Sequence, residues 1–221
     1  MDADWPGTHR CAVPAEGRAV ALLLTGALNP THRGHIAMMA HARRHLEAAG
    51  HTVLAGWLSP SHDSYVQAKY ARRGEHAFSA ALRREMCRAA CASSDWLACA
   101  AWESRVQGRW PDFPEVVAAL DDHLSARCPQ PVTVAYVCGA DHLRHIRQGF
   151  GHPRRWVVGV PRTAHALPDA LGAGVFLTGP EPTTASISAT QVRQAMRRGL
   201  PLEPLLHPGV IRILQRSVPL S

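Results

Sequence analysis

Lysine is nearly missing from this 221-residue chain: Lys69 is the only one, although lysine and arginine together number 24. The net charge of +7 therefore comes almost entirely from arginine, and no long basic block occurs. A charge spread in this way gives little support to nucleic-acid binding, which usually needs a basic patch or stripe. A small substrate that carries phosphate accounts for the sign of the charge equally well.

A long apolar run is also missing, since no window approaches the ~18 consecutive apolar residues of a membrane-spanning helix. The amino terminus has Asp2, Asp4 and Glu16 in place of a basic start and an apolar block, which argues against a signal or transit peptide. We expect residues 1–17 to be a loose tail and residues 18–221 to form one domain. We also expect an intracellular, cytoplasmic protein, with a nuclear location left open.

Cysteine pairs with redox or metal-binding spacing are missing as well. None of the six cysteines forms a Cys-x-x-Cys pair, and several fall in apolar runs, which predicts buried free thiols in a reducing compartment. Cys87 and Cys91 are one helical turn apart, but no histidine stands at ligand spacing, so the sequence predicts no zinc site. The six are Cys11, Cys87, Cys91, Cys99, Cys128 and Cys138.

Apolar strand segments alternate with helical patterns along the chain. This alternation predicts an α/β fold, a doubly wound Rossmann-like parallel sheet with C-terminal helices. A ligand would bind at the carboxyl ends of its strands. A long polar loop is expected over 59–74. We predict strands at 19–25, 52–58, 96–101, 131–138, 156–160 and 174–178, and helices at 36–49, 75–92, 115–126, 142–148, 188–198 and 208–216.

The stretch TGALNPTHRGH, residues 25–35, follows the first apolar run. Gly26 permits a sharp exit from the strand through positive φ. His32 and His35 flank Gly34 at the expected start of the next helix, where free backbone N–H groups attract anions. Imidazole N–H groups can also stabilise charge on a phosphoryl group. We interpret the stretch as a phosphate site; two surface histidines in a loop are the alternative.

A second stretch near the end of the chain supports this interpretation. Ser188 followed by Gln191 is a capping-box pattern, which predicts a helix start at Ser188. Thr190 lies in the first turn and Arg193 one turn later, and a guanidinium binds phosphate through two hydrogen bonds. Alone, the stretch fits an ordinary capped helix with an exposed arginine. Together, the two stretches predict the two sides of a triphosphate clamp.

These residues resemble the HxGH nucleotidyltransferase superfamily. Residues 26–35 look like its G-x-F-x-P-x-H-x-G-H motif, and residues 187–193 look like its I-S-x-T-x-x-R motif. The segments 59–65, 102–104 with Trp110, and 138–141 are similar to the S-P-V-x-D-x-Y, W-E-S…W and C-G-A-D segments of eukaryotic-type nicotinamide-mononucleotide adenylyltransferases. The resemblance covers residues 19–216.

The resemblance implies that the phosphate of nicotinamide or nicotinate mononucleotide attacks ATP, giving NAD or its deamido form and pyrophosphate, with Mg²⁺ assisting. It implies catalytic roles for His35, His32 and Arg193. It implies ATP binding by Gly26, Ala27, Ser188, Thr190, Gln191, Val192 and Lys69. It implies acceptor binding by Trp110, Trp102, Gly139, Asp141 and Glu181. Trp110 is the first candidate for stacking on the pyridine ring, and Trp102 is the second. Magnesium would rely on substrate phosphates more than on a protein site.

The chain also departs from the family pattern. Leu28 replaces the usual phenylalanine, and Lys69 is the only lysine after Tyr65, where the family has a lysine-rich segment. The segment after Asp141 is shorter than in the animal enzymes, which removes the expected place of a second stacking tryptophan. The choice between the amide and the acid mononucleotide therefore stays open.

Other functions remain to be distinguished. The chain fits, less well, another HxGH transferase of the pantetheine-phosphate adenylyltransferase or cytidylyltransferase type. A non-catalytic nucleotide-binding or chaperone-like relative is a further alternative. The expected partners are small-molecule substrates. We expect no membrane partner and no nucleic acid, and we leave open whether the protein forms a homo-oligomer.

Overall fold

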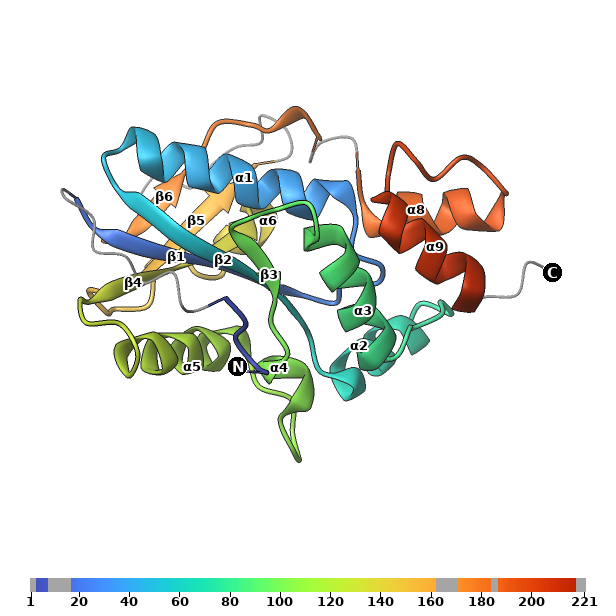
Figure 1. Ribbon diagram of the computed structural model, residues 1–221, viewed down its shortest axis with the longest axis horizontal. Coiled ribbons are helices and arrows are strands. Elements are labelled where there is room, and N and C mark those ends of the chain that lie inside the picture. The colour runs from blue at the N-terminus through green and yellow to red at the C-terminus, as the bar shows by residue number, and fades with distance from the viewer. Residues whose placement is uncertain (1–2, 8–16, 162–170, 184–186, 218–221) are drawn as a thin grey trace.

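The computed structural model describes residues 3–7, 17–161, 171–183 and 187–217, and within them one parallel sheet (Figure 1). The strand order is β3-β2-β1-β4-β5-β6, and every neighbouring pair is parallel. This confirms the predicted doubly wound fold, in which the order reverses between β1 and β4. The strands are β1 (Ala19–Gly26), β2 (Thr52–Pro60), β3 (Leu97–Cys99), β4 (Val132–Gly139), β5 (Arg155–Val160) and β6 (Val175–Leu177).

Helices cover both faces of the sheet (Figure 1). The helices α1 (Arg33–Ala48) and α3 (Ala80–Cys91) pack on one face. The helices α5 (Phe113–Ser125) and α6 (Ala140–Leu143) pack on the other. At one end, α8 (Ala189–Arg197) and α9 (Pro208–Ser217) share a separate apolar cluster with α3. The C-terminal helices therefore extend the layer that contains α3.

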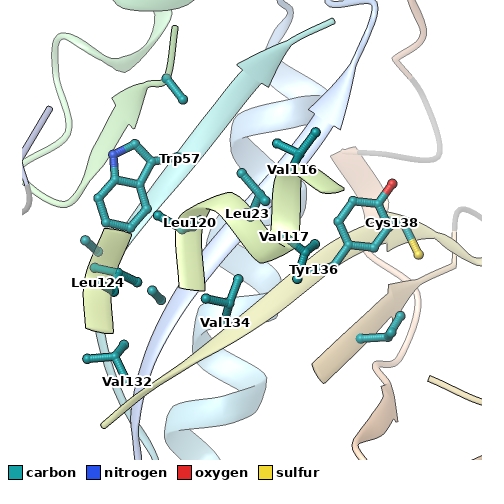
Figure 2. Packing of buried hydrophobic residues seen from close by; sticks show 14 of the residues in the cluster. Leu23, Trp57, Val116, Val117, Leu120, Leu124, Val132, Val134, Tyr136 and Cys138 are labelled. Atoms are coloured by element: carbon teal, nitrogen blue, oxygen red, sulfur yellow. The ribbon is translucent and has the colours of Figure 1, made fainter. Parts of the chain in front are cut away.

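Neighbouring residues of a strand face opposite sides of the sheet, and helices cover both sides. This explains why the strands are unbroken apolar runs in the sequence. Leu22 and Leu24 in β1 join the cluster under α1 and α3, whereas Leu23 joins the cluster under α5. A parallel strand with helices on both faces has no side that is left for water. Figure 2 shows the α5 side, where Val117 and Leu120 lie close to Val134 of β4.

The predicted loop over 59–74 is wrong in its middle, because helix α2 (Asp63–Ala71) lies there. The imidazole of His62 caps this helix by accepting from the backbone N–H of Ser64. Val66 and Tyr70, one turn apart, are its buried residues. Two apolar anchors in nine residues make too weak a periodic pattern to separate such a helix from a loop.

Three further helices differ from the prediction. The helix expected over 142–148 is instead the short α6, which ends at Leu143, and residues 144–150 form turns. The helix expected over 75–92 starts only at Ala80, where the Ser79 hydroxyl accepts from the N–H of Leu82. The short helix α4 (Trp102–Arg105) follows β3 and was not expected. The side chain of Ser104 in α4 donates to the carbonyl of Ala101, which closes the turn locally.

The amino-terminal residues 3–7 pack on the domain. For these residues the structure differs from the expected loose tail. Trp5 is 2% exposed and its ring stacks on Trp102 with centroids 6.3 Å apart. The indole N–H of Trp57 donates to the carbonyl of Pro6 at 2.8 Å, and the N–H of Ala101 donates to the carbonyl of Asp4. Trp5 thus fills the space between α4 and the sheet.

The free-thiol prediction holds for Cys87, Cys91, Cys99 and Cys138, which are buried and unbridged. Burial raises the pKa of the Cys138 thiol to about 12. The prediction is wrong for Cys128, which forms a disulfide. Cys11 lies outside the described residues. Over the described ranges, the structure contains no helix that combines the length and apolar character required to cross a membrane.

Candidate active site

A cavity of about 420 Å³ opens at the carboxyl ends of β1 and β4. Gly26 at the end of β1 and Gly139 at the end of β4 both line it. The two strands are neighbours and mark the point where the strand order reverses, which is where doubly wound sheets bind ligands. The fold therefore places the cavity where the sequence predicted a ligand.

The turn after β1 bends at a different residue from the one predicted. Leu28, not Gly26, has positive φ, at 45°, and its side chain is buried. The following Asn29–Pro30 peptide is cis. The buried Asn29 side chain donates to the carbonyl of His76 and accepts from the N–H of Phe78, both at 2.9 Å. The role of Gly26 is instead to leave open space beside the cavity, since a Cβ added there would meet no neighbouring atom within 4 Å.

His35 lines the cavity at the start of α1. Its Nδ1 accepts a hydrogen bond of 3.1 Å from the backbone N–H of His32. A backbone N–H can only donate, so Nδ1 of the neutral ring is unprotonated and Nε2 carries the hydrogen. His32 is buried behind His35, with the two rings stacked at 3.6 Å between centroids. The predicted pair therefore consists of one ring at the cavity and one ring that supports it.

The two motifs that the sequence predicted to converge do meet. A Cβ added at Gly34 would lie 3.3 Å from the carbonyl oxygen of Ile187, the residue before Ser188. The guanidinium of Arg193 in α8 donates to the carbonyl of Asn29 at 3.2 Å. A glycine at 34 is what lets the segment before α8 approach α1 this closely.

Arg193 itself does not reach the cavity. Among the described residues that line it, no member of α8 appears. The guanidinium is 6% exposed and binds the carboxylate of Glu75 at 2.7 Å. It also donates to the hydroxyls of Tyr70 and Thr190, each at 3.3 Å, and lies 4.8 Å from the centre of the Tyr70 ring. In this structure, Arg193 is a buried partner of Glu75.

The other predicted site residues divide into two groups. Those that line the cavity, besides His35, are Gly26, Ala27, Lys69, Trp110, Gly139 and Asp141. Those that the structure places elsewhere, besides His32 and Arg193, are Ser188, Thr190, Gln191, Val192, Trp102 and Glu181. The Ser188 hydroxyl accepts from the N–H of Gln191 as the capping pattern predicted. Val192 packs against α9, and Trp102 packs against Trp5.

An aromatic and cationic group forms one side of the cavity. Trp110 is 47% exposed, and its ring centre lies 6.2 Å from that of Tyr65 in α2. The ammonium of Lys69, one turn further along α2, lies 5.5 Å from the centre of the Tyr65 ring. An exposed indole and an ammonium group that both lie near the Tyr65 ring suit a ligand that has both a flat ring and a phosphate.

Glu103 supplies a buried carboxyl to the same cavity. It accepts from the hydroxyl of Ser59 at 2.7 Å and is 4% exposed. Burial raises the pKa of Glu103 to about 7, although the Ser59 and Ser61 hydroxyls and Arg83 act in the opposite direction. The cavity therefore contains a carboxyl that titrates near neutral pH.

Residues that the sequence did not single out also shape the site. Arg83 of α3 is fully buried and donates to the carbonyls of Ala27 and Ser61, which both line the cavity. It also pairs with Asp63 at 2.8 Å. In the sequence this position is one of two adjacent arginines within a helical pattern, which does not suggest burial.

The carboxylates of the site bear on how a metal ion could be held. Within the ranges that the structure describes, no group of three or more His, Cys, Asp or Glu side chains is arranged to hold a metal ion. Asp141 is an exposed carboxylate at the cavity, whereas Glu103 is buried and bonded to Ser59. An exposed carboxylate such as Asp141 fits a magnesium ion that is held mainly by substrate phosphates and water.

A doubly wound parallel sheet with imidazole and ammonium donors at its switch point defines a nucleotide-binding α/β protein. The family model for cytidylyltransferase-like proteins matches residues 23–195, and the chain belongs to this family. The resemblance drawn from the motifs is thereby confirmed at the level of the superfamily.

Individual relatives narrow the comparison. The chain is 26% identical over 222 aligned residues to a nicotinamide/nicotinic acid mononucleotide adenylyltransferase of Arabidopsis thaliana, covering 89% of this chain and 88% of the relative. It is 37% identical over 124 residues to nicotinamide/nicotinic acid mononucleotide adenylyltransferase 2 of Caenorhabditis elegans, about half of each chain (56% and 52%).

A solved structure shares the fold. The Plasmodium falciparum nicotinic acid mononucleotide adenylyltransferase, complexed with NaAD, superposes with a TM-score of 0.63 at 10% identity. The match covers 90% of this chain and 96% of that chain. At this identity the similarity shows the fold, and the site must be argued from its own residues.

We predict that Glu103→Gln changes how stability depends on pH. The raised pKa of Glu103 means that the folded protein releases this proton at higher pH than the unfolded chain, so wild-type stability falls between about pH 4.5 and 7. The amide does not titrate. Its stability relative to wild type should be on the order of 2 kcal/mol more favourable at pH 8 than at pH 5. Urea unfolding at both pH values measures this, and an equal difference at both would contradict it.

We also predict strong coupling between Arg193 and Glu75. A double-mutant cycle with Arg193→Ala, Glu75→Ala and the double variant should give a coupling free energy of roughly 1–3 kcal/mol in urea unfolding. The side chains are 7% and 17% exposed, so removing one leaves the other buried and unpaired. The control is the Arg43–Glu47 pair on the surface of α1, for which we expect no more than ~0.5 kcal/mol. Equal coupling in both pairs would show that Arg193 is not held in this way.

Proposed function

We propose that the protein transfers the adenylyl group of ATP to nicotinamide or nicotinate mononucleotide, giving NAD or its deamido form and pyrophosphate. The observation that carries this proposal is that His35, whose bonded Nδ1 leaves the ring hydrogen on Nε2, lines the switch-point cavity together with Tyr65, Lys69 and Trp110. The names of the relatives point to the same reaction.

The chemistry needs little covalent help from the protein. The mononucleotide phosphate attacks the α-phosphorus of ATP in line, and pyrophosphate leaves, so catalysis consists of positioning and of stabilising negative charge. His35 would donate from Nε2 to a phosphoryl oxygen as charge develops. Magnesium would enter with the triphosphate and neutralise part of its charge.

The acceptor would lie against the wall that α2 and the Trp110 loop form. The exposed face of Trp110 suits a cationic pyridinium, a contact worth about 0.5–2 kcal/mol. Lys69 supplies a permanent positive charge beside it for the phosphate. Both the amide and the acid form of the ring fit this description, so both belong among the proposed acceptors.

For α8 to contribute to a triphosphate clamp, Arg193 has to exchange its present partner, Glu75, for a phosphate. We propose that Ser188, Thr190 and Arg193 bind the outer phosphates of ATP, as the motif resemblance implies. Arg193 would then leave Glu75, its partner in the structure described here. A triphosphate carries more negative charge than one carboxylate, so the exchange is favourable for the guanidinium.

The test is a panel of acceptors and nucleotides, read by pyrophosphate release. ATP with either pyridine mononucleotide should give turnover, whereas ATP with pantetheine phosphate, or CTP with phosphocholine, should not. His35→Asn should lower kcat roughly 10²-fold or more with little change in melting temperature. Asparagine can still accept from the N–H of His32 but cannot place a donor where Nε2 lies.

The matched control is His41→Asn in the same helix, because the His41 ring binds the carbonyl of Gly179 and does not line the cavity. This control should turn over at the wild-type rate. No pyrophosphate from wild type with either mononucleotide would end the proposal. Turnover that His35→Asn leaves intact would remove His35 from the reaction.

A further inference from the structure

We propose that His62 is a second imidazole donor of this site and that its Nε2–H binds the phosphate of the acceptor mononucleotide. The inference rests on the proposed function for the identity of the acceptor. The identity of the donor atom and its position in the cavity come from the structure alone. His62 occupies a variable position of the S-P-V-x-D-x-Y resemblance, and no role was expected for it.

Two hydrogen bonds fix the His62 ring. Its Nδ1 accepts from the backbone N–H of Ser64 at 3.2 Å and lies 2.7 Å from the Ser64 hydroxyl. The backbone N–H can only donate, so Nδ1 is unprotonated and the hydrogen of the neutral ring sits on Nε2. His35 is held in the same way by the N–H of His32. Both rings line the cavity, and each turns its bonded nitrogen toward its own backbone.

The position of His62 places this donor next to the end of β1. The preceding residue, Ser61, donates its N–H to the carbonyl of Gly26 at 2.9 Å. His62 therefore stands at the carboxyl end of β2, beside the strand that leads to His35. The two imidazoles enter the cavity from two adjacent strand ends.

The neighbours of His62 indicate which ligand group it meets. Tyr65 and Lys69 follow it on α2 and line the same cavity, and Trp110 lies beside Tyr65. Among the described cavity residues, Lys69 is the one permanent cation, and no arginine is present. A phosphate whose attached ring rests on Trp110 needs a second donor on this wall, and the Nε2–H of His62 is available for it. The outer phosphates of ATP, by contrast, belong to the α8 side.

Two substitutions separate this role from helix capping. His62→Asn keeps an oxygen that can accept from the N–H of Ser64, since asparagine is a good cap residue, but removes the distal donor. His62→Gln places an amide N–H near the position of Nε2 but weakens the cap. His152→Asn is the matched control, because Nδ1 of His152 accepts from the N–H of Arg154 at 3.3 Å, and His152 does not line the cavity.

The measurement is the Kd of nicotinamide mononucleotide by titration calorimetry, together with kcat/KM and the melting temperature. His62→Asn should raise this Kd roughly 10-fold and lower kcat/KM for the acceptor at least as much. The Kd of ATP and the melting temperature should stay at wild-type values. His62→Gln should lose thermal stability yet keep more affinity for the mononucleotide than His62→Asn. His152→Asn should leave both affinities unchanged.

Two results would overturn the proposal. One is an unchanged mononucleotide Kd in His62→Asn. The other is a loss of affinity that follows the loss of melting temperature across the two variants. If wild type fails to turn over any mononucleotide, the proposed function fails, and inorganic phosphate becomes the calorimetric probe. Weaker phosphate binding in His62→Asn would then still support His62 as a phosphate ligand, and equal or undetectable binding in both proteins would refute it.

Discussion

The geometry of the cavity depends on one buried guanidinium. Arg83 reaches from α3 to the carbonyls of Ala27 and Ser61, which follow β1 and β2, and it neutralises its charge on Asp63. A cation that is fully removed from water is tolerated only when its hydrogen bonds and charge are matched in this way. The segments that it joins line the cavity, and this side chain holds them together beyond the last strand pairs, along with the hydrogen bond from the N–H of Ser61 to the carbonyl of Gly26.

With these loops fixed, backbone amides orient the side chains that face the ligand. The N–H of His32 and the N–H of Ser64 each occupy Nδ1 of a histidine, at 35 and at 62, and so assign the proton to the other nitrogen. Such rings need no further partner to be held ready as donors, which lowers the cost of ordering them when a phosphate binds. Glu103 differs, since burial moves its pKa to about 7 and makes its charge sensitive to small changes nearby.

The sequence was sufficient to predict the sheet, and about half of the predicted site residues line the cavity. Buried parallel strands such as β1 are continuous apolar runs with few competing interpretations, and the motif residues at their ends, among them His35, line the cavity. Helix α2 was missed because its two buried residues, Val66 and Tyr70, give only a weak helical periodicity of apolar residues. Trp110 was the first candidate for ring stacking and Trp102 the second, but the sequence could not show that Trp5, from the distant amino terminus, packs on Trp102.

Arg193 shows why spacing alone cannot fix a role. The motifs meet as predicted, since Arg193 donates to the carbonyl of Asn29 and Gly34 admits the chain next to Ile187. Yet a guanidinium placed one turn into α8 has two anions within its reach, Glu75 and, under the proposed function, a nucleotide phosphate. A buried arginine is rarely left unpaired, and under the proposed function nucleotide binding would change the identity of its partner. Without nucleotide, Glu75 balances the charge of Arg193, and under that proposal a triphosphate would replace the carboxylate because it carries more negative charge.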